Sequence, residues 1–125
     1  MQNYRNLIAW KKGHALAIAG YRVARSLPAE ERFEMGSQLR RALVSITSNI
    51  AEGSSRSSDR AFAAFLDSSA ASAAEVENLL LLAADVGYIG REVHEPIDAQ
   101  VREVRRVVAR LRSVVKAAAL ENRRR

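Results

Sequence analysis

The apolar residues of the chain recur at alternating spacings of three and four in four separate blocks, which is the period of an amphipathic α-helix. This pattern predicts helices over residues 4–26, 35–53, 58–86 and 92–119. The connections between these helices are short and contain residues that stop or cap a helix, among them Pro28, Ser57 or Ser58, and Gly87. Four amphipathic helices with short connections predict an all-α fold, an antiparallel up-down four-helix bundle.

One apolar stripe on each predicted helix is expected to face the core. In the first helix His14 fills a place in the stripe and is expected to be packed, whereas His94 is expected to be solvated. Gly53 stands where a left-handed cap would close the second helix. Phe33 and Met35 are expected to pack inward against the long third helix. The four stripes are Leu7, Trp10, Ala17, Tyr21 and Ala24; Leu39, Leu43, Ile46 and Ile50; Phe62, Phe65, Ser69, Ser72, Val76, Leu79, Ala83 and Val86; and Ile97, Val101, Val104, Val108, Leu111, Val115 and Ala118.

The net charge of +6 on 125 residues is concentrated at the C-terminal end of the chain. Residues 101–125 contain nine basic and two acidic side chains, whereas the first 100 residues are almost balanced. We therefore divide the chain into one domain, residues 1–120, and a basic C-terminal tail, residues 121–125. This asymmetry favours a polyanionic partner such as nucleic acid. The alternative is a solvated helix face with a basic tail.

Six basic residues of the fourth predicted helix fall on one broad side of a helical wheel, away from the apolar stripe. Arginine dominates the set, and its planar fork suits phosphate oxygens. No aromatic residue is interleaved with these six, so a base-stacking platform is not indicated there. The candidate nucleic-acid contacts are Arg102, Arg105, Arg106, Arg110, Arg112 and Lys116, with Arg40, Arg56 and Arg60 as additional candidates.

A second, polar stripe runs along the second predicted helix, where Arg41, Ser45, Ser48 and Glu52 recur at helical spacing with Asn49 beside them. One interpretation is a solvent face with a helical ion-pair pattern. The other is a packing or oligomer motif, ending at Gly53, against which another helix or subunit lies closely.

Catalytic and metal-binding signatures are missing from the sequence. Neither histidine follows a glutamate by three residues, so the Glu-x-x-His motif of di-iron bundles is absent, and no cysteine is present. Neither a phosphate-binding loop nor a nucleophile elbow occurs. We therefore predict no enzyme activity, no metal and no cofactor. No signal peptide and no membrane-length apolar run are visible, which predicts a cytoplasmic protein without a membrane partner.

The strings Gln-Leu-Arg-Arg-Ala at 38–42 and Ser-Ile-x-x-Asn-Ile-Ala-Glu-Gly at 45–53 resemble the signature of proteins encoded in intervening sequences of bacterial 23S ribosomal RNA genes. Further similar segments lie at 7–11, 27–31, 72–77 and 82–89. The resemblance implies an antiparallel four-helix bundle that assembles into a homopentamer. It also implies similarity to the accessory variability protein of diversity-generating retroelements, a basic barrel that binds nucleic acid and its reverse transcriptase.

Charge and resemblance together predict a non-catalytic, oligomeric nucleic-acid-binding accessory protein. Its basic face would make sequence-tolerant phosphate contacts with RNA or DNA. One alternative is a protein-interaction scaffold that docks an acidic partner such as a reverse transcriptase. The other is a structural bundle with no polyanionic ligand.

Overall fold

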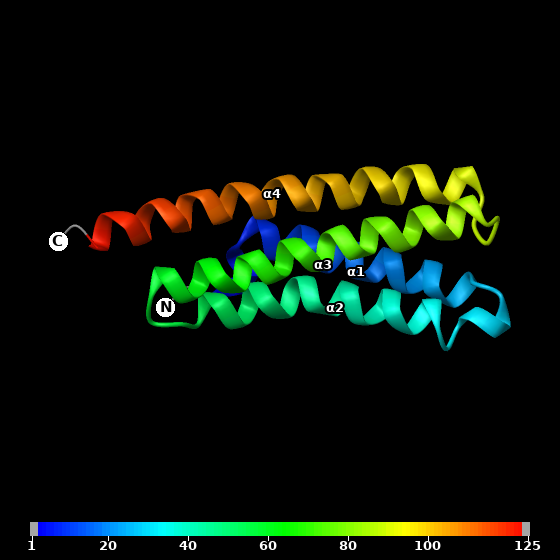
Figure 1. The fold of residues 1–125 in the computed structure, drawn as a ribbon. Helices are drawn as coiled ribbons and strands as arrows, with labels where there is room; N and C mark the ends of the chain where they lie inside the picture. Colours follow the sequence, from blue (N-terminus) through cyan, green and yellow to red (C-terminus); the bar gives the residue numbers. More distant parts are fainter. Residues whose placement is uncertain (1–2, 124–125) are drawn as a thin grey trace.

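Four long helices lie alongside one another, and consecutive helices run in opposite directions (Figure 1). The computed structural model describes residues 3–123. Each helix packs against its neighbours in the chain, and the last packs against the first. The predicted all-α four-helix fold is therefore confirmed. The helices are α1 Ile8–Ser26, α2 Met35–Ser54, α3 Asp59–Asp85 and α4 Arg91–Arg123, with short 3-10 helices η1 Tyr4–Asn6 and η2 Ala29–Glu31.

The helix ends agree with the prediction to within a few residues, and their capping groups explain where they fall. Ser58 caps α3, because its hydroxyl accepts a hydrogen bond of 3.1 Å from the backbone N–H of Ala61. The chain leaves α3 through Gly87, whose φ is +86°. α4 continues about a turn past its predicted end, so residues 121–123 of the predicted tail are helical. Arg124 and Arg125 lie outside the described residues.

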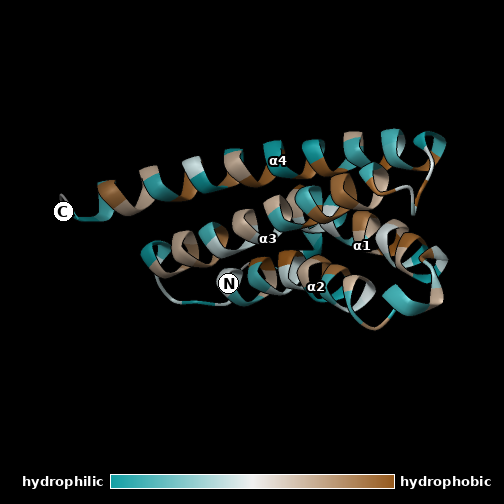
Figure 2. Cartoon of the chain, turned by 45° about the vertical axis from the view of Figure 1, so that its right-hand side comes forward, coloured by the Kyte–Doolittle hydropathy of each residue, from teal (hydrophilic) through white to brown (hydrophobic). Residues whose placement is uncertain are grey.

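The core consists mainly of the predicted stripes of α2, α3 and α4. Leu39, Leu43, Ile46 and Ile50 of α2 are all at most 2% exposed. The hydropathy colouring shows the apolar positions of α4 turned toward the other helices and its polar positions turned away (Figure 2). The core residues of α4 are Ile97, Val101, Val104, Val108 and Val115.

Outside α1, two apolar residues expected in the core are exposed instead. Phe33 is 87% exposed, because the turn between η2 and α2 directs Met35 rather than Phe33 against the core. Val86 is 52% exposed, because α3 ends just before it and the chain then turns. Ile89, whose backbone N–H bonds back to the carbonyl of Ala83, fills the core at that end of the bundle.

The helix α1 faces the core on a side that is rotated from the predicted stripe, although Ala24 is fully buried and Leu7, Trp10 and Ala17 pack partly buried against the core. Its buried face is Ala9, Gly13, Leu16, Gly20, Val23 and Ala24. A Cβ on Gly13 would lie 3.0 Å from Cγ2 of Thr47, and one on Gly20 would collide with the side chain of Leu43. These glycines therefore let α1 approach α2 closely. The predicted packing of His14 is wrong: its side chain is exposed, as is that of Tyr21.

Candidate nucleic-acid interface

The six cations predicted on the last helix all lie on α4, along its outward side. Arg102, Arg105, Arg106 and Arg110 are exposed, and Arg112 and Lys116 are half-buried. The side-chain exposure of the five that form ion pairs ranges from 42% to 68%. The helix therefore presents a long row of positive side chains to solvent.

Carboxylates of α3 and α4 lie against most of this row. Glu77 of α3 pairs with Arg105 and, at 3.8 Å, with Arg102, which also pairs with Asp98 at 3.1 Å. Asp67 of α3 pairs with Arg112 and, at 3.9 Å, with Lys116. The sequence alone did not indicate Glu77 and Asp67 as partners, because these pairs join residues far apart in the chain, unlike the pair of Arg102 with Asp98. They neutralise much of the charge of α4 at its seam with α3.

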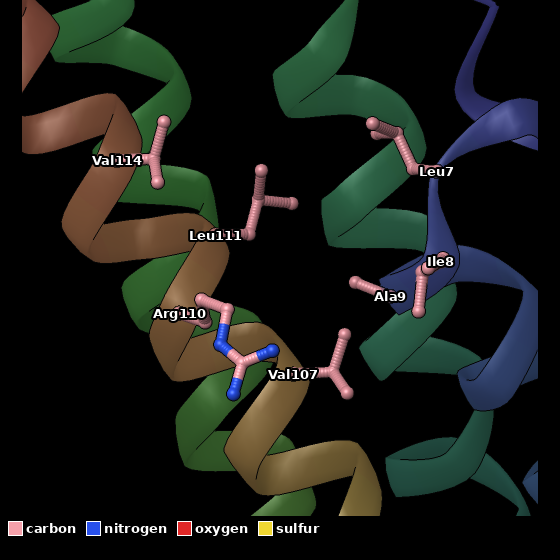
Figure 3. A pocket seen from close by; sticks show the side chains of 7 residues that line it. All are labelled: Leu7, Ile8, Ala9, Val107, Arg110, Leu111 and Val114. Carbon is pink, nitrogen blue, oxygen red and sulfur yellow. The ribbon is translucent and has the colours of Figure 1, made fainter.

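Two cations of the row, Arg106 and Arg110, differ in whether a carboxylate pairs with them. Arg106 pairs with Glu103 on its own helix, and this hydrogen bond lowers the pKa of the Glu103 carboxyl below its usual value. Arg110 forms no ion pair within residues 3–123. Its guanidinium stands at the edge of a pocket between the start of α1 and α4, beside Val107 and Leu111 (Figure 3). The pocket is lined by Leu7, Ile8, Ala9, Val107, Arg110, Leu111 and Val114.

The three additional candidates are divided between two parts of the bundle. Arg60 and Arg123 line one hollow, in which the start of α3 meets the end of α4. Arg56 lies in the turn that joins α2 to α3, and its guanidinium carbon is 4.8 Å from the ring centroid of Phe65. Arg40 lies on α2, whose packing neighbours are α1 and α3, and it donates a hydrogen bond to the carbonyl of Arg32. The fold thus brings Arg56 and Arg60 to the end of α4 but not Arg40.

The polar stripe of α2 is split between a helix contact and solvent. The hydroxyl of Ser72 on α3 lies 2.7 Å from that of Ser45, and Nδ2 of Asn49 donates to the carbonyl of Ser45 at 2.7 Å. The hydroxyl of Ser69 on α3, fully buried, donates to the carbonyl of Ile46 at 2.8 Å. The remaining members of the stripe, Arg41, Ser48 and Glu52, are exposed.

Gly53 is a packing residue rather than a cap. It lies inside α2, and Gly87 alone among the described glycines has a positive φ. A Cβ on Gly53 would lie 2.7 Å from Cβ of Phe65 and 2.8 Å from Cδ1 of Phe62. The predicted left-handed cap is therefore wrong, since the absence of a side chain here allows α2 and α3 to meet.

The two halves of the bundle carry very different charge. The helices α1 and α2 contain six Lys and Arg and one carboxylate, whereas α3 and α4 contain nine Lys and Arg and ten carboxylates. Part of the positive surface therefore lies on α1 and α2, where only Arg40 was a predicted nucleic-acid contact. A signal for it was present in the sequence: the first acidic residue of the chain is Glu30.

Within residues 3–123 no cluster of acidic or histidine side chains could hold a metal ion. None of the described helices combines the length and the hydropathy needed to span a bilayer. His94 is half-buried rather than solvated. Its Nε2 is buried and has no hydrogen-bond partner in the part of the chain that the structure describes. His94 lies in the first turn of α4, where the folded chain covers this nitrogen.

Comparison with known proteins supports the relationship that the 45–53 segment indicates. A family described as "23S rRNA-intervening sequence protein" matches residues 5–110. A crystal structure from Bacteroides thetaiotaomicron, of a protein with unknown function from the S23 ribosomal protein family, is 26% identical with a TM-score of 0.78. The match covers 87% of this chain and 99% of that one. No curated protein matches the chain. The chain therefore belongs to the 23S rRNA-intervening sequence protein family.

Proposed function

We propose that this protein is a non-catalytic, oligomeric accessory protein that binds RNA or DNA through the basic face of α4. The observation that supports the proposal is a row of six cations along one side of a single continuous helix. Contacts of this kind are made to phosphates, so the binding tolerates changes of base sequence. The row comprises Arg102, Arg105, Arg106, Arg110, Arg112 and Lys116.

The ion pairs with α3 do not prevent phosphate binding. An exposed ion pair contributes only about 0–1 kcal/mol, and solvent screens it. A phosphate can therefore replace the carboxylate as the partner of Arg102, Arg105 or Arg112, each of which is more than 40% exposed. Arg110 needs no such exchange and is expected to make the strongest single contact of the row.

Self-association would strengthen binding. The family resemblance implies a homopentamer, and it implies similarity to the accessory variability protein of diversity-generating retroelements. A ring of identical subunits repeats the α4 row around its circumference. Several weak contacts on one polyanion then act together through effective concentration.

A titration of labelled RNA and DNA at low and moderate salt tests the proposal. We expect binding that weakens steeply as salt rises. Charge reversal in Arg105→Glu/Arg106→Glu is expected to abolish binding, whereas Arg91→Glu, at the start of α4 and outside the row, is the control and is expected to retain binding. Absence of binding at low salt rejects the proposal. A monomeric mass in sedimentation rejects the oligomer and with it the multivalent mechanism.

One observation favours a second candidate, a scaffold for an acidic protein. The pocket in Figure 3 is apolar apart from Arg110, so it suits an apolar side chain next to a carboxylate. For this candidate, Arg105→Glu/Arg106→Glu leaves nucleic-acid binding unchanged, and binding of an acidic polymerase partner is lost instead.

A further inference from the structure

Three aromatic rings lie along the side of α1 that was expected to face the core, in line with an isoleucine and an arginine, and the Trp10 ring is partly buried. Trp10, His14, Ile18, Tyr21 and Arg25 are spaced four, four, three and four residues apart, so they lie on one side of the helix. The rings of Trp10 and His14 are stacked, with centroids 4.7 Å apart and an interplanar angle of 12°. His14 is exposed, Tyr21 is 38% exposed, and Ile18 between them is 47% exposed. We call this row the α1 aromatic stripe.

A groove between α1 and α2 contains the central part of this stripe. Apolar side chains from both helices line it, and two arginines lie among them. The lining residues are His14, Ala17, Ile18, Tyr21, Arg22 and Arg25 of α1 and Val44 and Thr47 of α2. An apolar, aromatic surface edged by guanidinium groups has the chemistry of a site that stacks bases and neutralises phosphates.

The cations at this groove lack the compensation seen on α4. Arg22 and Arg25 form no ion pair within residues 3–123. No carboxylate occurs on α1, and Glu52 alone occurs on α2. A polyanion that binds here displaces no protein carboxylate, in contrast to one that binds along α4.

We propose that the groove between α1 and α2 is a binding site for single-stranded nucleic acid. Tyr21 and His14, whose ring is backed by that of Trp10, stack on bases, and Arg22 and Arg25 contact the adjoining phosphates. A ring lying on a helix surface reaches the face of a base only where that base is unpaired, so the site selects single strands over duplex. Tyr21 lies about 10 Å along α1 from His14, so the two ring positions engage bases that are not adjacent.

This inference deepens the proposed function, because both surfaces bind the same class of ligand. The α1 groove adds selectivity for strand form, which the phosphate contacts of α4 lack. A second copy of this chain is a less suitable occupant of the groove. In such a copy Asp67 and Glu77 already pair with α4, so Arg22 and Arg25 could be complemented only by isolated carboxylates such as Glu75 and Asp85, whereas every nucleotide of a single strand brings a phosphate.

Equilibrium binding of three probes tests the site: a 12-nucleotide oligouridylate, a 12-nucleotide oligothymidylate and a blunt 12-base-pair duplex. We expect Tyr21→Ala to weaken both single strands at least about fivefold, because one lost base stack has this effect, and to leave duplex binding unchanged. Tyr21→Phe keeps the ring and is expected to keep wild-type affinity. Phe33→Ala is the matched control, since it removes an aromatic ring that is 87% exposed outside the groove. If Tyr21→Ala loses helical signal, Tyr21→Leu replaces it.

A second readout follows the ring pair directly. The chain contains one tryptophan, so stacking of a base against the Trp10–His14 pair changes the whole tryptophan emission. Single strands are expected to quench it in the wild type and in Phe33→Ala, and the duplex is not. Equal affinity for oligouridylate and oligothymidylate indicates recognition through base stacking. A preference for the RNA strand adds a contact to the 2′-hydroxyl within the same site.

Paired charge variants separate this inference from the proposed function. Arg22→Gln/Arg25→Gln is expected to weaken single strands more than duplex, and Arg105→Gln/Arg106→Gln to weaken both alike. If Tyr21→Ala and Arg22→Gln/Arg25→Gln bind single strands as tightly as the wild type, the α1 site is rejected while α4 binding stands. If only the α1 variants weaken binding, the α4 proposal is rejected and the α1 site stands. A change in sedimentation mass for Tyr21→Ala, with nucleic-acid binding intact, assigns the groove to self-association and also rejects the site.

Discussion

The pair α1 and α2 differs from the pair α3 and α4 both in how the helices meet and in where their charge goes. The first pair meets closely at Gly13 and Gly20, and its surface cations have few carboxylates nearby. The second pair contains no glycine, and Asp67 and Glu77 form ion pairs across its outer seam. Similar helices therefore produce one half in which Lys12, paired with Glu103 of α4, is the one described helix cation with an ion pair, and one half that is close to neutral.

This difference shows that the net charge of a segment of the sequence does not determine the net charge of the surface on which that segment lies in the folded chain. The C-terminal segment has the largest excess of cations in the sequence, but folding places the acidic α3 beside it. The field that a polyanion experiences depends on all nearby charges rather than on one helix. None of the cations of α1 was predicted from the sequence to contact nucleic acid. In the folded chain these cations have fewer ion-pair partners than those of α4.

The largest expected effect is on the close contact between α1 and α2. Gly20→Val is expected to destabilise the fold by about 1–3 kcal/mol, because the new side chain must displace the fully buried Leu43. Urea denaturation followed by circular dichroism measures the change. Ala15→Val, on the exposed side of the same helix, is the control and is expected to cost no more than about 0.7 kcal/mol. Equal losses in the two variants would contradict the close approach.

The next effect comes from removing the carboxylates that compensate α4. Asp67→Asn/Glu77→Gln is expected to strengthen duplex binding several-fold at low salt, because Arg105 and Arg112 lose their acidic partners. The salt dependence is expected to steepen by up to about 0.9 for each new phosphate contact. Glu75→Gln/Asp85→Asn makes the same change in net charge on α3 without releasing an α4 cation. An equal gain in this control shows that net charge, rather than pairing, limits binding.

The ion pair between Arg105 and Glu77 is expected to make a smaller contribution, to the stability of the fold. A double-mutant cycle with Arg105→Ala and Glu77→Ala is expected to give a coupling of about 0.2–1 kcal/mol, since both side chains remain partly exposed. Thermal unfolding of the four proteins measures it. A coupling well above this range shows that the seam between α3 and α4 depends on charge as well as on apolar packing.

The smallest effect is a pH dependence from Glu103. The hydrogen bond from Arg106 lowers the pKa of this carboxyl below its usual value of 4.5. The folded state therefore binds this proton less readily than the unfolded state, so the pair stabilises the fold above pH 4.5, and the stability is lost as the pH falls through the folded pKa. Glu103→Gln is expected to flatten this part of the acid unfolding curve. A curve that is identical in wild type and variant contradicts the contribution of the pair.

The sequence predicted most of the fold because periodicity is a local signal. Leu39, Leu43, Ile46 and Ile50 recur at helical spacing and are all buried, and the same holds for the valines of α4. The prediction held only in part on α1, because two positions of its core face are Gly13 and Gly20, which have no apolar side chain and give no signal in the apolar pattern. The predicted stripe through Trp10 and Tyr21 therefore lies at the edge of the core, where Trp10 is partly buried and His14 and Tyr21 are exposed.

The candidate site could be predicted only in part. The six α4 cations lie on one exposed side of the helix, as the helical wheel indicated, because the geometry of one helix is enough to place them. Their partners were not predictable, because Asp67 and Glu77 reach α4 only through the packing of α3. Arg40 lies apart from Arg56 and Arg60 for a similar reason, since the distance between helices depends on their order around the bundle.

The sequence by itself determined the four helices and the apolar sides of α2, α3 and α4. It also contains the 45–53 segment, which resembles the signature of the family to which the chain belongs. These properties depend on residues close together in the chain. The tertiary structure decided which side of α1 faces water, where the positive charge remains uncompensated, and that Gly53 is a packing residue. Each of these depends on a side chain that another helix brings near, such as Leu43, Glu77 or Phe65, and spacing along one helix does not contain that information.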